Sequence, residues 1–138
     1  MNANQKDKSK SFYFFDFDDN IMFLSTPIFV KNKKTNEVKE LSTSEFANIR
    51  TELGQIEPWK AYAVYDGTYS HFRDIPEDDL QPGQKQWFVQ DVEDALAESA
   101  DKWKAPSWDL FVYACRKERP LAIVTARGHH PETLKAGI

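Results

Sequence analysis

Two apolar segments near opposite ends of the chain constrain its fold more than any other feature. "FYFF" at 12–15 and "PLAIVTA" at 120–126 are almost continuously apolar, the pattern of strands that are covered on both faces. An amphipathic helix is expected at 106–118, just before the second segment, and another helix at 131–138, just after it. This alternation predicts an α/β fold in which the two strands belong to one parallel sheet.

The region between these segments is expected to form short strands and helices. A Lys- and Asn-rich turn and an Asp66-Gly67 turn, each between β-prone residues, predict two hairpins. Ser42 and Glu45 have the spacing of a capping box, which predicts the start of a helix. The expected elements are, in order, a hairpin at 27–41, a helix at 42–53, a hairpin at 61–72, a loop at 78–84 and a helix at 88–99.

Composition excludes several classes of protein. The chain has 138 residues, of which 41% are hydrophobic, so it is long and apolar enough for one globular domain with a core. A net charge of −4 argues against broad binding to nucleic acid, and no apolar run reaches the roughly 18–20 residues of a membrane helix. Residues 1–10 are polar and predict a flexible tail without a signal peptide. The single cysteine, Cys115, predicts a cytoplasmic protein, and its place on the apolar face of its helix predicts a core position.

Acidic residues follow the first apolar segment directly. Asp16, Asp18 and Asp19 come at its end, and Thr125 comes at the end of the second segment. Ligands of open parallel sheets bind beyond the carboxyl ends of the strands, so we expect Asp16, Asp18 and Thr125 to lie together. Carboxylates that lie close together repel one another unless a cation or a proton lies between them. The sequence therefore predicts a Mg²⁺ site, and Asp19 is expected to be a turn residue.

The same residue types suit phosphoryl transfer. A carboxylate can attack phosphorus and form an aspartyl-phosphate. A second carboxyl group can protonate the leaving group and then activate water. The hydroxyl of Thr125 and the backbone N–H groups after it can hold phosphate oxygens.

Both ends of the chain resemble the haloacid dehalogenase-like (HAD) hydrolases. "FFDFDDNIMF" resembles the first motif of that family, and "LAIVTARG" resembles the second. The resemblance implies that Asp16 is the nucleophile and a Mg²⁺ ligand. It implies that Asp18 is the general acid and base, and that the backbone carbonyl of Asp18 also binds the metal. Thr125, with Ala126 and Arg127, would then bind the phosphate of the substrate.

The resemblance also implies a domain organisation. It predicts a Rossmann-like, HAD-type parallel sheet over 11–138, with a flap hairpin and a small insertion at about 27–105. The family's third motif, a Lys, and its fourth, an acidic pair, should follow Thr125 at a distance that the remaining residues do not span. We therefore expect the domain to be incomplete at its C-terminus, with weak Mg²⁺ binding and little activity alone. We also expect self-association through an exposed sheet edge.

The residues leave alternatives open. The chain is either a Mg²⁺-dependent phosphohydrolase that acts on a small phosphate ester, or a non-catalytic module that binds phosphate or metal. Arg127 is either a contact to substrate phosphate or a surface residue. His129 and His130 suggest metal ligands or a loop and helix cap, and the absence of a nearby Cys or third His favours the cap.

Overall fold

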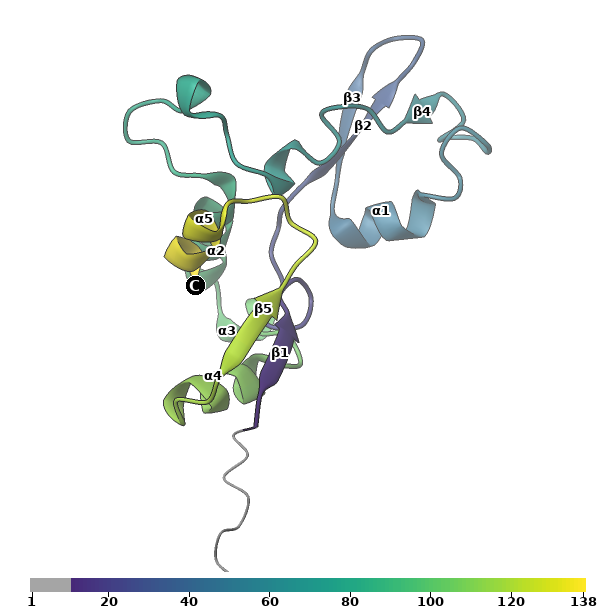
Figure 1. The fold of residues 1–138 in the computed structure, drawn as a ribbon. Coiled ribbons are helices and arrows are strands. Elements are labelled where there is room, and N and C mark those ends of the chain that lie inside the picture. The colour runs from purple at the N-terminus through teal and green to yellow at the C-terminus, as the bar shows by residue number, and fades with distance from the viewer. Residues whose placement is uncertain (1–10) are drawn as a thin grey trace, which may run out of the picture. The chain divides into compact units, whose positions relative to one another are not determined.

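A computed structural model describes residues 11–138, and the tail expected at 1–10 lies outside the described residues. The described chain divides into two compact units. Unit 1 comprises residues 11–23 and 99–126, and unit 2 comprises residues 24–98 and 127–138. The fold is mixed α/β, with a two-stranded parallel sheet in unit 1 and a three-stranded antiparallel sheet in unit 2 (Figure 1).

The elements fall into the two units as follows. Unit 1 contains β1 (Tyr13–Asp16), α3 (Ala100–Trp103), α4 (Trp108–Arg116) and β5 (Leu121–Val124). Unit 2 contains β2 (Ile28–Asn32), β3 (Val38–Leu41), α1 (Thr43–Ile49), β4 (Tyr62–Ala63), α2 (Trp87–Leu96) and α5 (Pro131–Gly137), with 3₁₀ turns at Ser70–Phe72 and Glu77–Asp79. No helix in the described part of the chain has both the length and the apolar character needed to cross a membrane.

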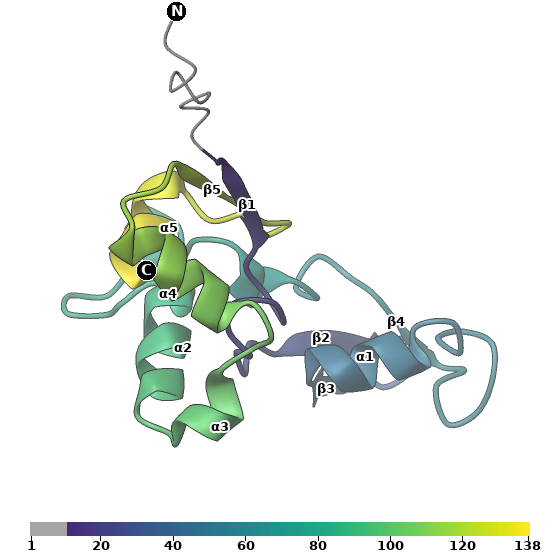
Figure 2. The same cartoon turned by 90° about the horizontal axis from the view of Figure 1, so that it is seen from below.

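The predicted parallel pairing of the two apolar segments is confirmed. β1 and β5 pair in parallel, from Tyr13 opposite Leu121 to Asp16 opposite Val124. The two strands run side by side in both views (Figures 1 and 2). Helix α4 immediately precedes β5, as the alternating pattern predicted.

The prediction that both faces of these strands are covered is wrong. Phe15 is 5% exposed and packs edge-on against Phe111 of α4, with ring centroids 5.6 Å apart. Phe14 is 72% exposed and Val124 is 59% exposed. Successive side chains of a strand point to opposite faces, so packing against α4 buries only alternate residues. One apolar face of the parallel sheet is therefore exposed.

In unit 2 the first predicted hairpin is confirmed and the second is wrong. β2 and β3 pair antiparallel, and α1 lies along them (Figure 2). The short β4 pairs with β2 instead of returning as a hairpin. The hydroxyl oxygen of Thr68 accepts from the backbone N–H of Tyr65 at 2.8 Å, and Thr68 is fully buried. This closes the chain into a turn at Asp66-Gly67 and leads it into a 3₁₀ turn, so no second strand forms.

The four predicted helices begin within two residues of the predicted positions and end one to four residues early, and α3 was not predicted. The capping box of Ser42 and Glu45 is present, yet α1 ends at Ile49. Ser107 is the N-cap of α4, although its side chain makes no capping hydrogen bond. The core position predicted for Cys115 is wrong, because Cys115 is exposed and its neighbour Ala114 is buried. A shift of one residue turns a helical side chain by about 100°, which is enough to move it off the buried face.

Candidate functional site

The carboxyl ends of β1 and β5 meet at one edge of the parallel sheet in unit 1. Asp16, the last residue of β1, pairs with Val124, the last residue of β5. Thr125 follows Val124 directly, so Asp16 and Thr125 leave neighbouring strands at the same edge. Asp16 is exposed and Thr125 is half-buried. A ligand can therefore reach the carboxylate that the sequence singled out.

A tight turn after β1 positions the side chains that follow Asp16. Phe17 and Ile21 anchor the turn, since they are 2% and 0% exposed and the N–H of Ile21 donates to the carbonyl of Phe17 at 3.0 Å. Between them, Asp19 has a φ of 61°, in the left-handed region that Asp tolerates better than most residues. Asp19 is thus the turn residue that the sequence predicted.

The side chain of Asn20 connects oxygen atoms of the two predicted catalytic acids. Its Nδ2 donates to Oδ2 of Asp16 at 3.2 Å and to the backbone carbonyl oxygen of Asp18 at 3.2 Å. A carboxylate oxygen and a carbonyl oxygen therefore converge on one N–H₂ group. Asp18 itself is half-buried, with its backbone held by the turn.

These oxygens suit the metal that the resemblance implies. Mg²⁺ prefers oxygen ligands, and the two groups expected to bind it, the Asp16 carboxylate and the Asp18 carbonyl, already face a common point. Within residues 11–138, no cluster of three or more His, Cys, Asp or Glu side chains is arranged to hold a metal ion. At this point the structure offers one carboxylate and one carbonyl oxygen, and both accept a hydrogen bond from Asn20.

The three residues predicted to bind phosphate are divided between the units. Thr125 and Ala126 belong to unit 1, whereas Arg127 belongs to unit 2. Arg127 is only 6% exposed, so the interpretation of it as a surface residue is wrong. Its guanidinium lies over the rings of Phe72 and Phe88, at 4.6 and 5.2 Å from their centroids. A contact between Arg127 and substrate phosphate stays a prediction.

Arg127 takes part in a buried polar network within unit 2. Its Nη2 donates to Oγ1 of Thr26 at 2.8 Å, and that hydroxyl donates to Oδ2 of Asp91 at 2.6 Å. Its Nη1 lies 3.5 Å from Nε2 of His129, whose Nδ1 is 2.9 Å from Oδ1 of Asp74. A neutral imidazole with its proton on Nδ1 donates to Asp74 and accepts from Arg127, so every hydrogen bond has a matched donor and acceptor.

Asp74 ties this network to the start of α5. Its carboxylate accepts from the hydroxyl of Thr133 at 2.9 Å and from the backbone N–H of His130 at 3.2 Å. His130 occupies the N-cap position of α5, which agrees with the predicted helix cap. His129 is instead a buried member of the network, with its side chain fully shielded from solvent.

The network shifts the pKa values of its members. Burial lowers the pKa of His129, although the hydrogen bond to Asp74 opposes that shift. Burial raises the pKa of Asp91, against the effect of the Thr26 hydroxyl. Burial alone would raise the pKa of Asp74, but hydrogen bonds from His129, Thr133 and the backbone of His130 outweigh it and lower that pKa. At neutral pH, His129 is therefore uncharged.

Sequence reasoning missed three members of the network. The position of Asp91 could have been predicted from the sequence. It lies three residues after Phe88 on α2, so its carboxylate is near the buried face of that helix. Thr26 and Asp74 lie in irregular segments, where no periodicity marks which side chains are buried. Their partners are separated from them by 101 and 55 residues, so only the folded chain reveals the contacts.

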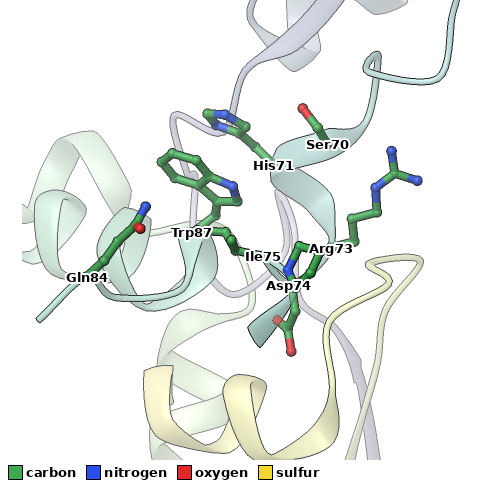
Figure 3. A pocket seen from close by; sticks show the side chains of 8 residues that line it. Ser70, His71, Arg73, Asp74, Ile75, Gln84 and Trp87 are labelled. Carbon is green, nitrogen blue, oxygen red and sulfur yellow. The ribbon is translucent and has the colours of Figure 1, made fainter. Parts of the chain in front are cut away.

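A shallow pocket of about 500 Å³ in unit 2 shares Asp74 with the network (Figure 3). Its aromatic wall is His71 stacked on Trp87, with ring centroids 3.8 Å apart, and burial lowers the pKa of His71. Arg73 points away from this pair of rings. A second hollow of about 700 Å³ shares Asp74, Ile75 and Pro76. The rings of His71 and Trp87 pack against each other, so this wall stabilises the loop around them.

No protein-family model, curated protein or solved structure matches this chain. Asp16, Asp18, Asn20 and Thr125, which lie at or just after the ends of β1 and β5, form the strand-end cluster of unit 1.

Proposed function

We propose that the chain is a Mg²⁺-dependent phosphohydrolase of the HAD type, acting through an aspartyl-phosphate on a small phosphate ester. The observation that carries this proposal is the pairing of Asp16 with Val124 at the end of a parallel sheet. It brings a solvent-exposed carboxylate next to Thr125, as the resemblance requires. It also supports the inference that β1 and β5 belong to a Rossmann-like, HAD-type sheet.

In the first chemical step, an Oδ atom of Asp16 attacks the phosphorus of the ester. The bond from phosphorus to the alcohol oxygen breaks, and Asp18 gives its proton to that oxygen. The Thr125 hydroxyl and the backbone N–H of Ala126 donate to the phosphoryl oxygens during the transfer. The products of this step are the free alcohol and an aspartyl-phosphate at Asp16.

In the second step, the Asp18 carboxylate takes a proton from water as the water oxygen attacks the phosphorus. The bond between phosphorus and Asp16 breaks, which releases inorganic phosphate and restores both carboxyl groups. When bound, Mg²⁺ would be held by the Asp16 carboxylate and the Asp18 carbonyl and would offset negative charge on the phosphoryl group.

The test is hydrolysis of a generic aryl phosphate with and without Mg²⁺, combined with chemical trapping of the acyl-phosphate. We expect slow, metal-dependent release of phosphate and a trapped adduct on the peptide that contains Asp16. Hydrolysis that is indifferent to Mg²⁺, or an adduct on another residue, would contradict the proposal.

A non-catalytic module that binds phosphate or metal is the second candidate. The observation that favours it is that, within residues 11–138, no group of three or more His, Cys, Asp or Glu side chains could hold a metal ion. Mg²⁺ and inorganic phosphate would then bind without turnover. Calorimetric titration alongside the hydrolysis assay separates the two functions, since binding without hydrolysis identifies the module.

We also propose that the exposed apolar face of the parallel sheet promotes self-association in the cytoplasm. Phe12, Phe14 and Val124 are 70%, 72% and 59% exposed, and parallel sheets are normally covered on both faces. Phe14→Ser should shift the protein toward monomer in light scattering, while Tyr113→Ser, an exposed aromatic on α4, should not. Equal association by both variants would show that this face is not involved.

A further inference from the structure

Two aromatic rings of unit 2 meet at an angle beside the antiparallel sheet. The ring centroids of Trp59 and Tyr62 lie 5.5 Å apart, and the ring planes are inclined by 67°. The face of an aromatic ring carries negative electrostatic potential, so two inclined rings can attract the same cation. The ammonium nitrogen of Lys39 lies over both rings, at 5.3 Å from the centroid of Trp59 and 4.9 Å from that of Tyr62. We call Trp59 and Tyr62 the aromatic corner.

The hydrophobic core of unit 2 and the backbone hold the two rings in place. Tyr62 belongs to that core and is 5% exposed, and its hydroxyl donates to Oε2 of Glu37 at 3.2 Å. Trp59 packs against the same core. The carbonyl of Trp59 accepts from the backbone N–H groups of Tyr62 and Gly54, each at 3.0 Å. A site that these rings form is therefore preorganised, which lowers the cost of binding.

The lysine is the replaceable partner in this contact. Lys39 lies on β3, an outer strand of the sheet, and is half-buried. Its ammonium group ends a flexible four-carbon chain and makes no salt bridge within residues 11–138. A primary ammonium is strongly hydrated, whereas an ammonium that carries methyl groups is hydrated more weakly and loses less on leaving water. A methylated ammonium can therefore displace Lys39 without a change in the backbone.

We propose that the aromatic corner is a binding site for a small quaternary ammonium ion, which replaces the ammonium group of Lys39 when it binds. The carboxylate of Glu37, hydrogen-bonded to the hydroxyl of Tyr62, adds negative charge beside the rings. All of these residues belong to unit 2. The site is thus separate from the strand-end cluster and does not depend on the proposed phosphohydrolase activity.

The experiment is an NMR titration of the whole chain with tetramethylammonium chloride at constant ionic strength, followed through the indole N–H signal of Trp59. In the wild type this signal should shift and reach saturation. Lys39→Ala removes the competing cation, so it should bind the ion about three- to ten-fold more tightly. Lys33→Ala removes an exposed lysine of the same hairpin and is the matched control, which should bind like the wild type.

Three outcomes of this titration would overturn the proposal. The first is the absence of a saturable shift in both the wild type and Lys39→Ala. The second is equal affinity of these two proteins, because Lys39 would then not occupy the site. The third is an equal response to neopentyl alcohol, a neutral molecule of similar shape, because apolar packing and not charge would then drive binding.

A second measurement uses wild-type protein alone, so it does not depend on how the variants fold. The Hε protons of Lys39 lie close to the two rings, whose ring currents shift their NMR signals. These signals should move toward the values of an exposed lysine as tetramethylammonium binds. Lys39 signals that stay unchanged at saturation would place the ion elsewhere and overturn the proposal.

Discussion

Each unit gathers polar side chains into one cluster, but the two clusters have opposite surroundings. In unit 1 the strand-end cluster centres on Asp16, which is exposed and whose Oδ2 accepts a hydrogen bond of 3.2 Å from Asn20. In unit 2 the buried network centres on Arg127 and His129, each only 6% exposed. Three of its hydrogen bonds have donor–acceptor distances of 2.6–2.9 Å. They join Arg127 to Thr26, Thr26 to Asp91, and His129 to Asp74.

This difference indicates that the cluster in unit 1 is suited to binding a ligand, whereas the network in unit 2 stabilises the fold. Buried polar groups are costly unless they are paired, and the described residues contain no buried side-chain nitrogen or oxygen without a partner. Paired groups have little capacity left for a ligand. An exposed carboxylate beside a carbonyl retains that capacity, so substitutions in unit 1 should change activity and substitutions in the unit 2 network should change stability.

The largest effect should come from Asp16→Asn. Loss of the nucleophile should abolish whatever aryl-phosphate turnover the wild type shows, while the circular dichroism spectrum and the free energy of unfolding stay unchanged. Asp19→Asn, in the same turn, is the control and should retain turnover. Near-wild-type turnover by Asp16→Asn would remove Asp16 from the nucleophile role.

Asp18→Asn should have a smaller and different effect. Loss of the general acid and base should slow turnover by roughly 10²–10⁴-fold and delay breakdown of the aspartyl-phosphate. Mg²⁺ affinity should stay within a few-fold of wild type, because the metal contact comes from the backbone carbonyl. Weaker metal binding with normal turnover at saturating Mg²⁺ would exchange the roles of Asp16 and Asp18.

Arg127→Leu should act on stability. It leaves the Thr26 hydroxyl and the Nε2 of His129 without this donor inside a buried network, which should lower the free energy of unfolding by about 2–4 kcal/mol. Urea denaturation monitored by tryptophan fluorescence measures the loss. Arg50→Leu, an exposed arginine at the end of α1, should change stability by less than about 0.5 kcal/mol. Equal effects of the two changes would remove the contrast between the clusters.

The smallest effect should be a pH dependence that originates from His129. Its pKa in the folded protein is lowered, so between that value and the unfolded value of about 6.5 the unfolded chain binds more protons. This contribution to stability is complete above about pH 6.5 and declines as pH falls, by up to about 1.4 kcal/mol per pH unit. His129→Gln should make the decline between about pH 6.5 and 5.5 in urea denaturation shallower and leave the part that comes from His71, whose pKa burial also lowers, whereas exposed His130→Gln should keep the whole decline. An unchanged decline in His129→Gln would assign it to another group.

Local patterns in the sequence predicted the elements that depend on neighbouring residues. Three such features depend on interactions over a few residues: the capping box of Ser42 and Glu45, the hairpin at 27–41, and Pro131 in the first turn of α5. The parallel pairing of β1 and β5 also followed from the sequence, because two apolar segments flanking a helix have few other ways to be buried. The adjacency of Asp16 and Thr125 is a consequence of that pairing.

Tertiary structure decided what depends on which face is covered and on partners distant in the chain. Phe14 and Cys115 are exposed because packing covers only one face of β1 and one side of α4. Composition does not reveal which face of a strand or helix stays uncovered. The burial of Arg127 depends on Thr26, 101 residues away, and a motif read locally contains no information about that partner. Hydrogen bonds between residues close in the chain can be predicted from the sequence. The burial of a side chain depends on how the folded elements pack against one another.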